Sequence, residues 1–599
     1  MPGIEFLEGD IVEVSHVKQY NGEALYGGTS GGTSGAYTVT LTPAPLGTTD
    51  YPVGTQVNFK VHASNAASPT LNVNGRGARP LVYNGQALAA SDLPVGSMVT
   101  VIYDGANWAL PFKFGAVSGQ LPTWTRPSDW LAMPTVSASE QKVVGLMAVY
   151  NHPSNYVALS ASGAYTVDWG DGSPPQNVAA GVKAERNLAW ADAPSTSLTS
   201  RGYRQMLITI TPQSGQNLTA FSLQQRHSGL PAALVTTAWL DLVVSLPQMG
   251  VPTLGGGVTA LALAERCRWI SRSSVSSSLA NLFNNFQSLQ SVELPSSLSN
   301  VTSTAGMFSY CYRLVSAPLF NTAATTNFST MFLACHSLQE VPLYNMAAAT
   351  NLSSMFESCT SLEQVPNFAT ASVTSMLSMF GYCRKLKQLP SLNYGSVTQM
   401  SGFAIHCMDL ESAPSLQLPL VVSAVQMFEG CGSLRSVGGL NLPLVTDLSF
   451  AFRNCGALRS VASLTTSTAL TNVSYLFLGC SQLLEVPLFV TSNVTNAYAM
   501  LGDCFHLRQV PALNLASVTN SGYLIATARS LVKFLATGLT RSLDLTNSLL
   551  VRSELVSLFT NLGTASGSQN LIITGNPGVA TLTPTDIAIA TSKGWTVVA

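Results

Sequence analysis

The segment Met355-Phe-Glu-Ser-Cys359-Thr-Ser-Leu362-Glu-Gln-Val365-Pro366 decides the fold, because its pattern returns at a fixed interval along the chain. Nine of the ten cysteines stand 24, 24, 24, 24, 24, 24, 25 and 24 residues apart; they are Cys311, Cys335, Cys359, Cys383, Cys407, Cys431, Cys455, Cys480 and Cys504. Neither disulfide pairing nor metal binding requires such regular spacing, whereas a repeating structural unit does.

Other positions of the repeat keep the same phase. A Met-Phe pair precedes most of these cysteines, as in Met331-Phe332, and a leucine always follows three residues after the cysteine. A valine and often a proline come next, as in Val341-Pro342. Two degenerate copies flank the series, with Phe286 and Ala528 in place of the cysteine. Nine units with a cysteine and two without make eleven.

One such unit cannot bury its apolar side alone, so stacked units must share a continuous core. The Leu-x-x-Val-Pro segment favours β structure, and we expect it to form one strand of a parallel sheet in each coil. Proline avoids central strands, so it should mark the point where the chain leaves the sheet.

The cysteines are predicted to be buried thiols that pack as small apolar side chains. In-register residues of adjacent strands lie about 4.8 Å apart, while a disulfide needs Cβ atoms about 3.8 Å apart. His336, His406 and His506 stand at different distances from their cysteines and form no column. We therefore predict no metal site, no cofactor and no catalytic residue.

The repeat resembles the leucine-rich repeats of bacterial surface-antigen (BspA-like) proteins over about residues 258–575. This resemblance implies a curved, right-handed solenoid with a parallel sheet on one side, used for adhesion. The end of the chain fits a repeat cap. Thr583-Pro584-Thr585-Asp586 reads as a helix N-terminus, the helix should extend to about Ser592, and Trp595–Val598 should close the sheet edge.

Before the repeats, short alternating segments predict small β-domains. We expect strands at Tyr37–Leu41, Gln56–His62, Thr70–Val73, Leu81–Tyr83 and Met98–Tyr103, separated by turns at Asn74-Gly75, Asn84-Gly85 and Asp104-Gly105. The segments Thr70-Leu-Asn-Val-Asn-Gly75 and Asp104-Gly-Ala-Asn-Trp108 are similar to a β-domain frequent near the N-termini of phage tail-fibre proteins.

A second β-domain contains Tyr165-Thr-Val-Asp-Trp-Gly-Asp-Gly-Ser173, which resembles the signature hairpin of PKD-like β-sandwiches. Asp168 and Asp171 could hold a calcium ion or act as a catalytic pair. Alternatively, the aspartates and glycines shape the turn while Trp169 packs inward. A further strand of the same sandwich is predicted at Met206–Thr211.

The predicted fold class is mainly β, with small N-terminal β-domains followed by a leucine-rich-repeat solenoid. The predicted divisions are a docking segment with a Gly/Ser/Thr linker (1–35), a small β-barrel or sandwich (36–112), a linker (113–123), a PKD-like sandwich (124–250), the solenoid (251–575) and a cap (576–599).

Composition limits the possible functions. The chain carries 28 basic and 29 acidic residues, a net charge of −1, so nothing indicates a nucleic-acid or anionic-lipid partner. The most apolar stretch, residues 231–246, is too short and too polar to span a bilayer. The N-terminus lacks a basic segment followed by an apolar one, so we expect synthesis in the cytosol without export.

These features predict a tail fibre or spike of a tailed bacteriophage, located in the virion tail, that acts at the host cell exterior. Expected partners are other copies of the chain in a homotrimer, the baseplate or other tail proteins at the N-terminus, and a bacterial surface glycan or outer-membrane protein. Any trimer contacts should lie in the N-terminal β-domains, because no coiled-coil heptads are present. A bacterial surface adhesin and a glycan-degrading spike remain alternatives.

Glycan cleavage would need two carboxylates at a fixed separation, and the acids of the solenoid are scattered, so no enzymatic activity is predicted. Positions four and five after each cysteine carry much of the solenoid's charge. We predict that they line up on the sheet face, where they are either merely solvated or bind the receptor. The candidate receptor-binding residues are Lys387, Gln388, Arg435, Arg459, Glu485, Arg508 and Gln509.

Overall fold

The computed structural model of the chain describes residues 124–229, 238–255, 263–272, 278–295, 298, 300–390 and 392–599. Before residue 111 it describes the strands given below and the short segments 66–69, 76–77, 88 and 106–107. The chain divides into two compact units. The first contains residues 1–276, 281–298 and 310–318, and the second contains 277–280, 299–309 and 319–599.

Eleven strands near the N-terminus form one sheet in the order β1-β2-β4-β5-β7-β8-β11-β10-β6-β3, with β9 paired to β8. Their bounds are β1 (Glu5–Leu7), β2 (Ile11–Val14), β3 (Ala24–Tyr26), β4 (Gly28–Thr33), β5 (Ala36–Val39), β6 (Gln56–Lys60), β7 (Thr70–Val73), β8 (Ala78–Tyr83), β9 (Gln86–Ala87), β10 (Met98–Tyr103) and β11 (Trp108–Leu110). All five predicted strands are confirmed. The predicted turn residues between them lie outside the described residues.

One expectation for this region is wrong. The Gly/Ser/Thr-rich end of the predicted docking segment (1–35) was expected to be a linker, but residues 28–33 form β4. This strand pairs with β2 on one side and β5 on the other, so ladder hydrogen bonds hold a backbone that composition alone would leave free. The predicted linker at 113–123 lies outside the described residues.

The next strands form a β-sandwich with sheets ordered β15-β14-β17-β12-β19-β20-β21 and β16-β13-β18. Their bounds are β12 (Lys142–Val149), β13 (Tyr156–Ala161), β14 (Tyr165–Asp168), β15 (Gln176–Val178), β16 (Lys183–Asn187), β17 (Arg204–Pro212), β18 (Phe221–Ser222), β19 (Trp239–Leu246), β20 (Arg266–Arg272) and β21 (Ser291–Glu293). The predicted strand at Met206–Thr211 lies within β17.

Tyr165 joins the two sheets of the sandwich. Its ring is fully buried, and its hydroxyl donates to the carbonyl oxygen of Val182 over 2.7 Å and accepts from the N–H of Ala184 over 3.1 Å. Burial raises the pKa of this phenol to about 12. The side chain therefore stays neutral and hydrogen-bonded inside the sandwich.

Strand β19 belongs to both the sandwich and the solenoid. It pairs antiparallel with β12 and parallel with β20, and β21 continues the parallel ladder. Asp241 of β19 is fully buried and accepts from the guanidinium groups of Arg126 and Arg266, each over 2.9 Å. Two cations compensate the buried carboxylate, as a charge in such a place requires.

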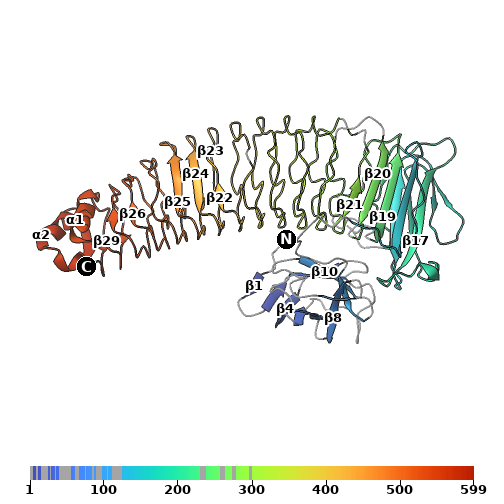
Figure 1. Cartoon of the computed structure of the whole chain (residues 1–599), viewed down its shortest axis with the longest axis horizontal. Helices are drawn as coiled ribbons and strands as arrows, with labels where there is room; N and C mark the ends of the chain where they lie inside the picture. The colour runs from blue at the N-terminus through green and yellow to red at the C-terminus, as the bar shows by residue number, and fades with distance from the viewer. Residues whose placement is uncertain are drawn as a thin grey trace. The chain divides into compact units, whose positions relative to one another are not determined.

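From residue 241 to 598 the chain winds through about 14 turns of a parallel β-solenoid, so the fold class is confirmed. The turns beyond the eleven that carry the motif lie at the two ends, where the cysteine pattern is absent. Figure 1 shows the coils of the second unit stacked toward the C-terminal helices.

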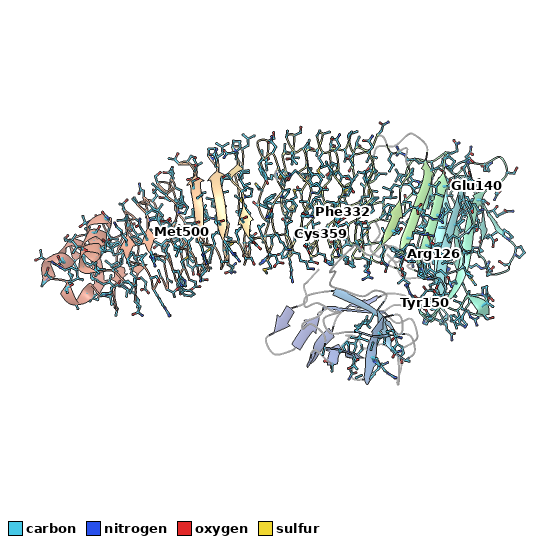
Figure 2. All side chains as sticks on the ribbon, in the orientation of Figure 1. Arg126, Glu140, Tyr150, Phe332, Cys359 and Met500 are labelled. Carbon is cyan, nitrogen blue, oxygen red and sulfur yellow. The ribbon has the colours of Figure 1, made fainter. Side chains whose placement is uncertain are left out.

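Phenylalanines three residues before the cysteines stack inside the coils; Figure 2 labels one of them, Phe332. The ring centroids of Phe308, Phe332, Phe356 and Phe380 are 5.6, 5.7 and 5.8 Å apart in succession, with planes within 5° of parallel. Each of these rings is completely buried. The stack supplies a continuous apolar core of the kind that the repeat predicted.

A polar ladder runs along a second side of the coils, eight residues before each cysteine. Parallel bridges join Ser278, Ser303, Asn327, Asn351, Ser375, Gln399, Ser423, Asp447, Asn472, Asn496 and Asn520. In the preceding column, mostly threonine, hydroxyls donate to the carbonyl one coil earlier, as Thr374 does to Thr350 and Thr398 to Thr374, each over 3.1 Å. Neutral hydroxyl groups thus supply hydrogen bonds to these backbone carbonyls, and no charged side chain is needed there.

Proline controls the length of the sheet strands, as predicted. Where Gly438 or Ala462 replaces the proline, strands of six residues form, whereas β22 and β26 stop at the residue before Pro414 and Pro511. The strands of this region are β22 (Ser412–Ala413), β23 (Leu416–Gln417), β24 (Ser436–Asn441), β25 (Ser460–Thr465), β26 (Gln509–Val510), β27 (Lys533–Phe534), β28 (Leu543–Asp544), β29 (Gln569–Ile572) and β30 (Trp595–Val598).

The C-terminal end forms the predicted cap. Helix α2 (Pro584–Thr591) begins with a capping box in which Thr583 and Asp586 bond each other's backbone N–H. Ser592 is its C-cap, and β30 then pairs parallel with β29, so the predicted helix and closing strand are confirmed. Helix α1 (Arg552–Asn561) was not predicted. Two short 3-10 helices complete the elements, at Ser195–Ser197 and Val579–Thr581.

Candidate binding face of the solenoid

The residues four positions after each cysteine form one continuous row. The N–H of Glu411 donates to the carbonyl oxygen of Lys387 over 3.2 Å, that of Arg435 to Glu411 over 2.9 Å, and that of Arg459 to Arg435 over 2.9 Å. The same ladder continues through Leu484 to Arg508. We call this set the charged row; it comprises Glu363, Lys387, Glu411, Arg435, Arg459, Leu484 and Arg508.

The two halves of the charged row differ in electrostatics. In the first half the signs alternate, and the Lys387 Nζ lies 3.3 Å from a carboxylate oxygen of Glu363. In the second half Arg435, Arg459 and Arg508 are all exposed. Within the part of the chain that the structure describes, no ion pair involves these three arginines. Their guanidinium groups therefore lie at the surface without a charged partner among the described residues.

The residues five positions after the cysteines form the neighbouring row. Gln388 bridges to Ser412, the strand pairs continue through Ser436 to Ser460, and Glu485 bridges to Gln509. Gln388 and Glu485 are exposed, whereas Gln509 is half-buried. The structure thus places all seven predicted receptor-binding residues in two adjacent rows.

The arrangement suits binding of acidic groups. A guanidinium offers a planar fork of donors that matches a carboxylate or phosphate. The backbone ladder fixes the Cα atoms of Arg435 and Arg459 in adjacent coils. The acids of the charged row, Glu363 and Glu411, are separated by the intervening coil of Lys387. Glu340 stands in the neighbouring row instead, as its position in the repeat predicted.

The cysteine column lies in the core and not on a binding face. All ten cysteines are free and buried, so the prediction that they pack as buried thiols is confirmed. Burial raises the pKa of Cys359 and Cys407 well above the ordinary range. Each thiol of the repeats, from Cys311 to Cys504, also donates to a carbonyl in the preceding coil, as Cys383 does to Phe356 over 3.0 Å, a contact that the sequence did not indicate.

The aspartates of the hairpin at residues 165–173 shape its turn. An oxygen of Asp168 accepts from the N–H of Gly170 over 3.0 Å, and one of Asp171 accepts from the hydroxyl of Ser173 over 2.6 Å. Burial alone would raise the pKa of Asp171, but the hydrogen bonds from Ser173 and the ion pair with Arg186 together lower it. Trp169 is fully buried, which confirms the turn interpretation.

Among the described residues, no three His, Cys, Asp or Glu side chains are grouped so that they could hold a metal ion. In the same residues, no helix has the length and apolar character needed to cross a membrane.

The structure also contains a row of aromatic side chains that was not predicted from the sequence. Phe450, Tyr475, Tyr498 and Tyr523 occupy successive coils, five or six residues before the cysteine position. We call these four residues the aromatic row. Aligning the repeats at that position would have indicated it, because earlier coils carry Ser354, Ser378 or Gln426 there.

The comparisons with known proteins concern the repeats. The family described as "Mycoplasma protein of unknown function, DUF285" matches residues 277–394 and 422–536. Together with the solenoid, this match fits a BspA-like repeat protein. No curated protein matches the chain.

Two solved structures show a weak likeness to the chain. One is the TLR13–ssRNA13 complex, with 14% identity, a TM-score of 0.20, and coverage of 55% of this chain and 47% of that one. The other is the plant peptide hormone receptor RGFR1 in complex with RGF2, with 12% identity, a TM-score of 0.11, and coverage of 59% and 84%. At these TM-scores neither likeness bears on the partners of this chain.

Proposed function

We propose that the chain is a tail fibre or spike of a tailed bacteriophage that binds a bacterial surface receptor through its solenoid. The N-terminal region attaches to the baseplate or another tail protein, and the N-terminal β-domains hold three copies together. Support for this proposal comes from the order of the parts: small β-domains of a kind frequent in tail fibres, then a sandwich, then a long repeat solenoid.

The observation that carries the receptor proposal is the second half of the charged row. Arg435, Arg459 and Arg508 project from a rigid backbone ladder and are exposed. One exposed ion pair contributes only about 0.2–1 kcal/mol, but three arginines held one and two coils apart can bind a surface that repeats its own acidic groups. Bacterial envelopes carry phosphates and carboxylates on glycans and on outer-membrane proteins, and either would be a suitable receptor.

A strain panel tests this proposal. The full chain is labelled with a fluorophore and added to a panel of bacterial strains, and the medium is assayed for released sugar. We expect strain-selective binding without sugar release. Binding accompanied by release would replace attachment with the glycan-degrading alternative. Binding to no strain would contradict the proposal.

A further inference from the structure

The aromatic row is a continuous, regular surface feature. The centroids of the Phe450 and Tyr475 rings are 4.6 Å apart and their planes are nearly parallel, at 14°. Tyr475 to Tyr498 spans 5.3 Å with planes at 57°, and Tyr498 to Tyr523 spans 5.7 Å at 72°. The rings therefore rotate along the row, so that its C-terminal half is not a closed face-to-face stack.

The fold does not require these side chains. Phe450, Tyr475 and Tyr523 have left-handed backbones, with φ of 61°, 59° and 54°, a conformation that is unfavourable for bulky residues. Gly402 occupies the same position of the repeat without that penalty. Tyr523 also remains 69% exposed. A bulky ring that is both strained and exposed, as at Tyr523, favours a role in binding over a role in packing.

The space around the rings is also arranged to hold them. Gly522 leaves room for Tyr498, because a Cβ at that glycine would lie 2.8 Å from the tyrosine ring. Tyr498 thus lies over the backbone of the next coil. Within the described residues, no protein group bonds the hydroxyls of Tyr475, Tyr498 or Tyr523, so they are free for a ligand.

Polar groups flank the aromatic row and offset one another in charge. The Arg453 guanidinium lies 5.4 Å from the Phe450 ring and 5.9 Å from the Tyr475 ring. One of its nitrogens lies 3.2 Å from a carboxylate oxygen of Glu429. Further along, Asp503 accepts from the hydroxyl of Thr527 over 2.9 Å, and both are exposed. The row therefore has hydrogen-bonding neighbours but no excess of positive charge.

These features select one class of ligand. A pyranose ring has an apolar face that packs on an aromatic ring and equatorial hydroxyls that bond to amphipathic tyrosines and flanking polar groups. Single-stranded nucleic acid also stacks on aromatic rings, but it needs a track of cations along its backbone, and the arginine that lies over the rings, Arg453, is paired with Glu429. A protein partner would need a broad apolar centre, whereas this row is one ring wide.

We propose that the aromatic row is a binding site for a linear polysaccharide of low charge, with successive sugar units following successive coils. Tyr498 and Tyr523 supply the stacking surfaces, and Arg453, Asp503 and Thr527 supply hydrogen bonds. The site is separate from the charged row and does not depend on the tail-fibre proposal. The chain would then have two binding rows on different parts of each coil.

A glycan array tests this site. The full labelled chain is applied to an array of bacterial capsular and O-antigen polysaccharides, with single-stranded DNA oligonucleotides and immobilised outer-membrane proteins as further probes. We expect retention on at least one polysaccharide of low charge. Retention on no polysaccharide, or only on the oligonucleotides or the proteins, would overturn the proposal.

Variants locate the binding. Tyr523→Ala should weaken polysaccharide binding by roughly tenfold, because an aromatic stacking contact contributes about 1–1.5 kcal/mol. Tyr523→Phe should keep most of the affinity, and Gly522→Ala should weaken binding by displacing the Tyr498 ring. Tyr382→Ala is the matched control, because Tyr382 is a surface tyrosine with a φ of 61° outside the row.

The outcomes separate the two binding rows. Equal polysaccharide binding by wild type and Tyr523→Ala, with both chains folded by circular dichroism, would refute the role of the aromatic row. An Arg435→Ala/Arg459→Ala/Arg508→Ala variant should keep its polysaccharide binding in this assay. If that variant lost it while Tyr523→Ala did not, the sugar would bind at the charged row, and the proposal would again be wrong.

Discussion

Replacing one core cysteine tests whether the column acts only as small apolar side chains. Cys383 is fully buried and donates to the carbonyl oxygen of Phe356 in the preceding coil over 3.0 Å. Cys383→Ala removes about one methylene equivalent of burial, near 0.8 kcal/mol, and a weak thiol hydrogen bond of about 0.5 kcal/mol. It also leaves a cavity of roughly 20 Å³ that costs about 0.5 kcal/mol. We expect a local destabilisation of about 2 kcal/mol.

The serine variant discriminates between the two roles of the thiol. If the column were purely apolar, Cys383→Ser would destabilise the coil more than Cys383→Ala, because burying a hydroxyl without a hydrogen-bond partner destabilises the folded state by about 1–3 kcal/mol. With the Phe356 carbonyl in reach, the serine hydroxyl keeps a hydrogen bond and loses mainly the apolar transfer. Cys383→Ser is therefore expected to lower the local free energy of unfolding by about 1 kcal/mol, which is less than the loss expected for Cys383→Ala.

The remaining thiols report the effect coil by coil. Every cysteine is buried and free, so alkylation requires local opening, and mass spectrometry gives a labelling rate for each site. Because a coil contacts only its neighbours, Cys383→Ala should accelerate labelling of Cys359 and Cys407 by roughly 30-fold and leave Cys504 unchanged. Faster labelling in the serine variant than in the alanine variant would refute the hydrogen-bond reasoning.

Two further predictions concern the sandwich and the cap. Gly145→Ala should destabilise the sandwich by about 1–3 kcal/mol, since its Cβ would lie 2.1 Å from the Trp239 ring; an unchanged thermal unfolding midpoint would contradict this. The Arg552 guanidinium and hydrogen bonds from Thr583 lower the pKa of Asp586 from its ordinary value of 3.8 to about 2. The ionised carboxylate therefore stabilises the cap fully above pH 4 and loses this effect as the pH falls through 2. Hydrogen exchange of residues 552–599, corrected for intrinsic rates, should show the loss in wild type and no such pH dependence in Asp586→Asn.

The sequence was most informative where one local rule repeats. The cysteine spacing determined the phase of the eleven coils that carry the motif, and the alternation of Pro414 with Gly438 accounts for where strands are short or long. The cap was equally predictable, because Thr583 and Asp586 act within a single helical turn.

Features that depend on distant pairing were not predictable in this way. Residues 28–33 read as a linker because nothing in their composition indicates the flanking strands β2 and β5. The aromatic row was overlooked for a related reason. Each ring alone looks like an ordinary surface residue, and only the 24-residue register brings the four together. The charged row was found because its charge stands out against a weakly charged chain.

The most direct test of the central proposal compares two triple variants on a strain that the wild-type chain binds. Arg435→Ala/Arg459→Ala/Arg508→Ala removes the arginines of the charged row. Arg384→Ala/Lys385→Ala/Arg529→Ala removes the same charge from exposed positions outside it. Flow cytometry with titrated chain should show a loss of about 10- to 30-fold in affinity for the first variant, corresponding to about 0.5–0.7 kcal/mol per arginine, and binding close to wild type for the second. Equal binding by wild type and both variants would contradict receptor binding through the charged row.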